Sequence, residues 1–268
     1  MVYLVGAGPG DPGLLTVRGR DLLNGCDAIA TDALANPAIV ASARLANPGV
    51  EIHDVGKRGG STESTSQDDI NALLVRLGRE GKRVVRLKGG DPLMFGRGSE
   101  EAQALYAAGV RFEMIPGVTS GVAAPAYAGI PVTHRGVATS VTFVTGHEDP
   151  TKAGTGTDWA ALARTGGTIV LYMGVKTLPS IAGALMAGGM LPDTAAAAVQ
   201  WGTYTRQRTI VATVSTLADA ITHAGLGAPV ITVIGNVVAL RDEIAWFDRR
   251  PLFGRRVVVT RASAQASG

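Results

Sequence analysis

Residues 84–92 are Val84-Val85-Arg86-Leu87-Lys88-Gly89-Gly90-Asp91-Pro92, a run that begins with two valines and ends in a glycine turn. Such a run predicts a strand followed by a loop. Similar strand-like segments surround it, and segments with helical spacing lie between them. The predicted strands of this half span residues 2–6, 27–31, 50–55, 83–88 and 111–115, and the predicted helices span residues 14–25, 37–45, 67–80 and 99–108. This alternation indicates a mostly parallel sheet covered by helices.

A stretch punctuated by glycine and proline, residues 128–136, separates this half from a second run of predicted strands. Those strands span residues 140–146, 168–173, 195–200, 208–214 and 229–235, and a helix over 237–247 is predicted to follow them, with Trp246 and Phe247 docking its end. A chain of 268 residues is long for a single core. We therefore expect two α/β domains, residues 1–133 and 134–247, followed by a tail over 248–268.

Composition excludes several functional classes. The net charge is +3, but residues 248–268 hold five arginines and one acid, Asp248, so the first 247 residues carry a net charge of −1. Aromatic residues make up only 5% of the chain, so the stacking surfaces of nucleic-acid binders are not expected. No apolar run is long enough to span a membrane, and the first residues have no export-signal pattern, which favours a cytoplasmic protein. One cysteine, Cys26, and four scattered histidines predict neither a disulfide nor a metal site.

The first glycine-rich loop, residues 6–13, follows a predicted strand and fits the G-x-G-x-x-G pattern of dinucleotide-binding proteins. Asp32 stands where such proteins place a ribose-binding acid. However, Pro9 and Pro12 remove backbone N–H groups from the turn that would hold a pyrophosphate. A loop short of donors suits a ligand without phosphate. An NAD(P)-dependent oxidoreductase stays open as an alternative, as does a tight turn that binds nothing.

Two more loops follow predicted strands in the same half. One spans residues 89–98, and the other spans residues 115–121, where Thr119 and Ser120 offer hydroxyls or a helix cap. Each loop alone is more often a plain turn. Because ligands of open parallel sheets bind outside the carboxyl ends of the strands, three such loops together favour a small-molecule site.

An ordered set of motifs carries a resemblance to a known family. The motifs are Val5–Leu15, Asp54–Arg58, Gln67–Asn71, Lys82–Gly98, Pro116–Arg135, Val144–His147 and Tyr172–Gly174. Over about residues 2 to 247 the chain resembles the tetrapyrrole methylase family. The resemblance implies transfer of methyl groups from two S-adenosyl-L-methionine molecules to uroporphyrinogen III, giving precorrin-2 for siroheme or cobalamin-type products. It also implies two α/β domains with the active site in the cleft between them, and a homodimer.

The resemblance assigns roles to individual residues. Asp32 is expected to accept a proton and Lys57 to donate one, although a helix cap and a surface charge are their plain alternatives. Arg97, Glu100 and Arg135 are expected to bind the carboxylate-bearing tetrapyrrole. The positions expected to hold S-adenosyl-L-methionine are Pro9, Gly89, Gly90, Asp91, Met94, Thr119, Ser120, Met173 and Gly202. For both methionines, filling the core is the alternative.

The sequence departs from the family pattern in two places. Thr31 and Leu34 stand near Asp32 where the family usually has a tyrosine before the aspartate and an arginine after it. Gln200 and Trp201 replace a more usual glutamate and asparagine before Gly202. The first departure puts the roles of the neighbours of Asp32 in doubt.

The tail resembles the start of a second enzyme, and two further alternative functions stay open for the chain. Residues 251–261 resemble the opening of uroporphyrinogen-III synthase, which predicts that this chain is the first part of a fused polypeptide; a disordered basic extension is the alternative. A methylase of a later precorrin is the rival within the family. A domain that senses its ligand without turnover is the non-enzymatic rival.

Overall fold

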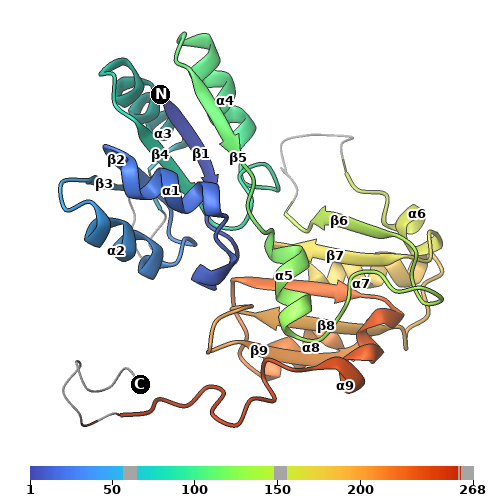
Figure 1. Cartoon of the computed structure of the whole chain (residues 1–268). Coiled ribbons are helices and arrows are strands. Elements are labelled where there is room, and N and C mark those ends of the chain that lie inside the picture. Colours follow the sequence, from blue (N-terminus) through green and yellow to red (C-terminus); the bar gives the residue numbers. More distant parts are fainter. Residues whose placement is uncertain (57–64, 148–155, 259, 261–268) are drawn as a thin grey trace.

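Two five-stranded sheets organise the chain into two α/β halves in the computed structural model, which describes residues 1–56, 65–147, 156–258 and 260 (Figure 1). The first sheet has the order β3-β2-β4-β1-β5, and all its strand pairs are parallel. Its strands are β1 (Val2–Gly6), β2 (Ala28–Thr31), β3 (Glu51–Asp54), β4 (Val84–Lys88) and β5 (Phe112–Ile115). The predicted strands of this half are confirmed to within one or two residues.

Helices cover both faces of the first sheet. They are η1 (Pro12–Leu14), α1 (Val17–Gly25), α2 (Pro37–Ala46), α3 (Gln67–Arg79) and α4 (Gly98–Ala107). One face packs a core with α1 and α2, and the other with α3 and α4. Local chemistry sets the helix starts: Asn36 caps α2 just before Pro37, and Ser66 with Asp69 forms a capping box on α3.

The second sheet is mixed, with the order β6-β7-β10-β8-β9. Its strands are β6 (Val141–Thr145), β7 (Thr168–Tyr172), β8 (Ala195–Gln200), β9 (Arg208–Thr213) and β10 (Val230–Ile234). Only β6 and β7 pair in parallel, because β10 runs antiparallel between β7 and β8. The remaining helices are α5 (Ser120–Tyr127), α6 (Trp159–Arg164), α7 (Leu178–Ala187), α8 (Leu217–His223), η2 (Asn236–Leu240) and α9 (Arg241–Ile244).

Helix α5 lies along the second sheet although it precedes the stretch 128–136 in the chain (Figure 1). Its buried residues Ala123, Ala124 and Pro125 face that half, and Ala124 shares a core with Val170 and Val233. The exact boundary between the domains stays a prediction.

The predicted helix over 237–247 is wrong in length and in type. Residues 236–240 form a 3-10 turn, and α9 ends at Ile244. The chain leaves the helix because Ala245 packs directly on the backbone of Gly129, where an added Cβ would lie 2.4 Å from the Ala245 Cα. Trp246 then donates its indole N–H to the carbonyl of Ala126 over 3.1 Å, so the expected docking of this aromatic end is confirmed.

Candidate functional site

Three glycine-rich loops meet at the carboxyl edge of the first sheet. Gly8 and Gly90 exchange backbone hydrogen bonds of 3.2 and 2.7 Å. Gly117, after β5, lies so close that a Cβ there would be 2.3 Å from the Gly90 carbonyl oxygen and 2.7 Å from the Gly6 Cα. Asp91 ties the loops further, because its Oδ2 accepts from the Gly117 N–H at 3.1 Å and its Oδ1 caps Leu93 at 2.8 Å. The predicted gathering of these loops is therefore present.

The first loop offers few free amides to a ligand. Pro9 and Pro12 carry none, the Gly8 amide bonds Gly90, and the amides of Asp11 and Gly13 donate to the Thr203 hydroxyl and to the Asp11 carboxylate. A pyrophosphate needs several amides pointing at it. This loop therefore does not suit a dinucleotide, whatever its glycine spacing.

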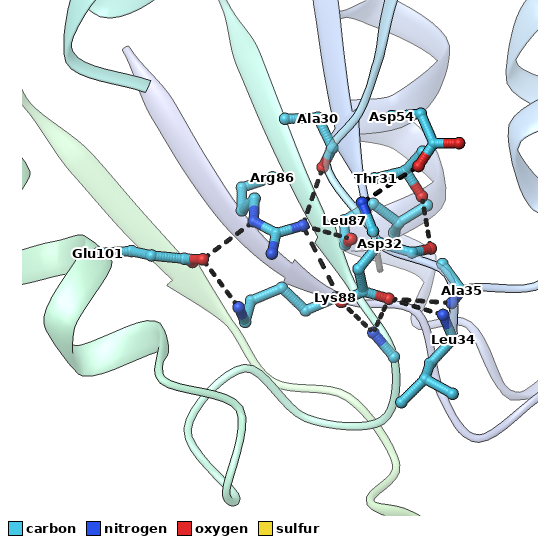
Figure 2. A network of polar contacts seen from close by, with 12 residues as sticks. Ala30, Thr31, Asp32, Leu34, Ala35, Asp54, Arg86, Leu87, Lys88 and Glu101 are labelled. Carbon is cyan, nitrogen blue, oxygen red and sulfur yellow. Dashed lines mark hydrogen bonds and ion pairs between the residues drawn. The ribbon is translucent and has the colours of Figure 1, made fainter. Parts of the chain in front are cut away.

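Asp32 lies at the end of β2, next to the second loop (Figure 2). Its Oδ1 accepts hydrogen bonds from Leu34 N at 3.0 Å and Ala35 N at 3.1 Å, and Gly89 N lies 3.4 Å from both carboxylate oxygens. Asp32 therefore caps a turn, and the helix-cap alternative is wrong because the N-cap of α2 is Asn36. Because the short bonds all use Oδ1, the Oδ2 atom keeps lone pairs for another proton donor.

A buried charge cluster lies beneath this loop: Arg86 and Lys88 on β4 and Glu101 on α4 (Figure 2). Glu101 is fully buried, and its Oε1 accepts from Arg86 Nε at 3.0 Å and Lys88 Nζ at 2.9 Å. Arg86 Nη1 reaches Asp32 Oδ2 at 3.9 Å and also donates to the Ala30 carbonyl. Burial, with the neighbouring guanidinium of Arg86, lowers the pKa of Lys88, while Glu101 opposes that shift.

The sequence reasoning missed this cluster, although a signal was present. Central strands of parallel sheets are buried on both faces, so cations at alternate positions such as 86 and 88 must be paired inside the protein. Their partner could not be identified from spacing, because two adjacent acids, Glu100 and Glu101, stand in the following helix.

Side chains and loops of the second half reach the same region. Tyr172, at the end of β7, places its hydroxyl 2.6 Å from the Thr119 hydroxyl and 2.7 Å from the Gly121 amide. Met94 packs partly buried against the core that contains Tyr172. Gly202 lies against α5, where a Cβ would meet that of Ala124 at 2.3 Å. Close packing against α5 therefore explains why residue 202 is a glycine. The Thr119 hydroxyl already has a hydrogen-bond partner in Tyr172.

Backbone strain is concentrated in these segments. Five described non-glycine residues have a positive φ: Phe95, Arg97, Met173, Trp201 and Thr203. All five lie in or beside segments predicted to bind the donor or the tetrapyrrole. Residues held in this region are costly and cluster at functional sites. Met173 is moreover 54% exposed, which a core-filling methionine would not be.

The residues predicted to bind the tetrapyrrole are exposed. Arg97 Nε and Nη2 donate to the two Glu100 oxygens at 2.8 and 2.7 Å, and these bonds raise the pKa of Arg97. Arg135 lies exposed in a turn after His134 and forms no ion pair with another described residue. Lys57 lies outside the described residues.

Two further findings concern metal and membrane. Among the described residues, no group of three histidine, cysteine or acidic side chains is arranged to hold a metal ion. Within the same part of the chain, none of the helices has the length and apolar character needed to cross a membrane.

Known proteins are similar to this chain in sequence and in fold. Residues 1–218 match the family of Tetrapyrrole (Corrin/Porphyrin) Methylases. The S-adenosyl-L-methionine-dependent uroporphyrinogen III methyltransferase of Methanosarcina barkeri is 51% identical over 90% of this chain and 93% of its own length. The uroporphyrinogen-III C-methyltransferase of Bacillus subtilis is 45% identical over 97% of this chain, which spans only 53% of that relative. A crystal structure of uroporphyrin-III C-methyl transferase from Thermus thermophilus, complexed with S-adenyl homocysteine, is similar with a TM-score of 0.74 and 36% identity, covering 89% of this chain and 99% of that one.

Proposed function

The chain belongs to the tetrapyrrole methylase family, and from that membership we propose that it is a C-methyltransferase that uses S-adenosyl-L-methionine. Its substrate is uroporphyrinogen III, which it methylates twice to precorrin-2. The observation that carries the proposal is the meeting of three glycine loops at the carboxyl edge of the first sheet, the first of them short of free amides and the third in contact with Tyr172. The name and nearly full-length match of the Methanosarcina relative support the same substrate.

The donor site consists of backbone and small side chains. Pro9, Gly89, Gly90 and Asp91 supply its floor, and the other contacts come from the remaining predicted positions: Met94, Thr119, Ser120, Met173 and Gly202. The donor brings a sulfonium-bound methyl group and no phosphate. The first loop, residues 6–13, has few free amides, which fits such a molecule, because a cation beside neutral backbone needs no N–H groups to hold an anion.

Asp32 accepts the proton that leaves the ring carbon after methylation. Its Oδ1 is fixed by two amides, which leaves Oδ2 to act as the base. Arg86 Nη1 lies 3.9 Å from this Oδ2 atom. Lys57 is proposed to donate a proton.

Arginine side chains hold the carboxylates of the tetrapyrrole. Arg97 already presents a fork to Glu100, so a substrate carboxylate exchanges with, or adds to, that pair. Glu100 thereby holds Arg97 in place before substrate binds. Arg135 supplies a second exposed cation.

The proposal also covers the oligomeric state, the cellular location and the C-terminal tail of the chain. The family resemblance supports a homodimer, and the lack of an export-signal pattern or a long apolar run in the sequence supports a cytoplasmic location. The tail is proposed to begin a fused uroporphyrinogen-III synthase, because residues 251–261 resemble the opening of that enzyme. The length of the Bacillus relative, of which this chain spans only 53%, is compatible with a longer polypeptide. Determining the coding sequence beyond the codon for Gly268 tests the fusion, since an immediate stop codon removes it.

Calorimetry and a matched pair of variants test the enzyme. We expect S-adenosylhomocysteine to bind the purified chain and NADP to leave no heat of binding. Asp32→Asn is expected to bind S-adenosylhomocysteine normally but to lose methyl transfer by about 100-fold or more, as for removal of a general base. Asp21→Asn, on an exposed helix position, is the control with unchanged activity. Tight NADP binding, or an active Asp32→Asn variant, contradicts the proposal.

A further inference from the structure

Four polar residues connect the first glycine loop to the second half of the chain. The Asp11 amide donates to the Thr203 hydroxyl at 2.9 Å, and the Tyr127 hydroxyl donates to Asp11 Oδ2 at 2.8 Å. Gln207 closes the group, because its Oε1 accepts from the Thr203 amide at 2.9 Å and its Nε2 donates to the Tyr127 carbonyl at 3.3 Å. We call Asp11, Tyr127, Thr203 and Gln207 the Asp11 cluster.

The loop itself is held on two sides. Asn36, at the start of α2, donates to the Gly10 carbonyl at 2.6 Å. From the other side, the ring of Tyr204 fills the space beside Gly10, where a Cβ would lie 2.1 Å from its Cε2 atom. Residues 10 and 11 therefore take their position from the second half as much as from the first sheet.

The backbone of Thr203 is strained in the conformation that places its hydroxyl beside Asp11. It is a β-branched residue with φ of 73°, only 4% exposed, and Trp201 two residues earlier also has a positive φ of 49°. β-Branched side chains are disfavoured in this backbone region. The conformation persists because both the amide and the hydroxyl of Thr203 are hydrogen-bonded within the cluster.

We propose that Asp11, Tyr127 and Thr203 are positioning residues that set the spacing between the two sides of the donor site. Asp11 follows Pro9 by two residues, and Thr203 follows Gly202 directly, so the Asp11–Thr203 bond joins two predicted donor contacts from opposite halves. The inference rests on the proposed function, because it takes Pro9 and Gly202 as contacts of S-adenosyl-L-methionine. It adds residues that touch neither the donor nor the tetrapyrrole.

The Tyr127 hydroxyl remains a hydrogen-bond donor over the physiological pH range. Burial, together with the hydrogen bond to Asp11, raises the pKa of Tyr127 to about 12. The tyrosine hydroxyl therefore keeps its proton and stays a donor to Asp11 under ordinary assay conditions.

Thr203→Val and Tyr127→Phe test the proposal, because each removes a hydroxyl and keeps the shape of the side chain. One lost hydrogen bond corresponds to about a fivefold to tenfold change in an equilibrium constant. We expect the Kd of S-adenosylhomocysteine and the KM of S-adenosyl-L-methionine to rise by that factor. The kcat at saturating donor and the KM of uroporphyrinogen III should stay within about twofold. Thr203→Ser keeps the hydroxyl and should restore donor affinity.

Two control variants remove hydroxyls elsewhere. Thr209→Val deletes a hydroxyl that has no partner within the described residues, and Tyr106→Phe alters a ring that is 81% exposed on α4. Both should bind S-adenosylhomocysteine as the wild type does. All affinities are measured well below each variant's unfolding midpoint. If Thr203→Val does not fold, Tyr127→Phe with Thr203→Ser gives the same comparison.

The outcomes separate this inference from the proposed function. Weaker donor binding in Thr203→Val or Tyr127→Phe, with normal binding in Thr203→Ser and both controls, supports it. Equal affinity in all variants overturns it while the proposed function stands. If the wild type itself binds no S-adenosylhomocysteine, the proposed function fails and the inference is overturned with it.

Discussion

Replacing Glu101 with glutamine tests the buried charge cluster most severely. Glu101 is fully buried and accepts from Arg86 and Lys88 through the same oxygen at 3.0 and 2.9 Å. At an effective dielectric constant of about 20, each of these pairs is worth about 5 to 6 kcal/mol of attraction, which the cost of desolvation largely offsets. The glutamine oxygen keeps a hydrogen bond, but two cations are left without their counter-charge.

Removing one partner of a buried pair costs about 3 to 5 kcal/mol, and we expect Glu101→Gln to lower the free energy of unfolding by about 3 kcal/mol at pH 7. The sign of the pH dependence follows from Lys88. Its pKa is lowered in the folded state, so the unfolded chain binds more protons and stability rises as the pH approaches 10.5. Without Glu101 this shift becomes larger, so the deficit of the variant should narrow between pH 7 and pH 10.

Urea unfolding followed by circular dichroism measures both effects. Glu113→Gln is the matched control: Glu113 pairs with Arg18 at 3.1 Å, but both side chains are about half exposed, so a loss below about 1 kcal/mol is expected. A Glu101→Gln loss no larger than that of the control would refute the reasoning. So would a deficit that grows as the pH rises.

Three further predictions concern separate features. Arg97→Ala should weaken binding of uroporphyrinogen III about tenfold in calorimetry and leave S-adenosylhomocysteine binding nearly intact, since its guanidinium faces Glu100 and solvent; equal loss of both contradicts this division. Burial raises the pKa of the Cys26 thiol to about 11, so the native protein should resist thiol reagents at pH 8. As the pH rises from 9 to 11, the thiol ionises in the unfolded chain before it ionises in the folded protein. The free energy of unfolding of the wild type should therefore fall by up to about 3 kcal/mol more than that of Cys26→Ala. Parallel curves of unfolding free energy against pH for the two proteins would disprove this prediction. Gly117→Ala should separate the three glycine loops or prevent folding, because the added Cβ would collide with the backbone of Gly90 and Gly6, which cannot move aside. A variant that unfolds thermally at the same temperature as the wild type would contradict this prediction.

The strands were predictable because their signals are local. Runs such as Val84–Leu87 followed by Gly89 give both the strand and its end, and the order of loops at strand ends then follows from parallel pairing. The helix over 237–247 was mispredicted because its end depends on Gly129, more than a hundred residues away. Nothing in the local sequence announces that contact.

The candidate site, like the fold, has features that the local sequence predicts and features that depend on long-range contacts. The glycine loops and Asp32 come together as expected, whereas the roles of the individual donor and substrate residues stay predictions. Arg86 and Lys88 were recognisable as charges in a central strand, but their pairing with Glu101 depends on how α4 lies across the sheet. The Asp11 cluster depends on contacts between segments up to 192 residues apart, and the strain at Thr203 has no counterpart in composition or periodicity.

The mass of the reaction product decides whether the chain methylates uroporphyrinogen III. The purified full chain is incubated without oxygen with uroporphyrinogen III and excess S-adenosyl-L-methionine, and the tetrapyrrole is followed by mass spectrometry. The account predicts two successive additions of one methyl group, with S-adenosylhomocysteine released at each step. An unaltered tetrapyrrole, under conditions where the donor binds, would contradict it.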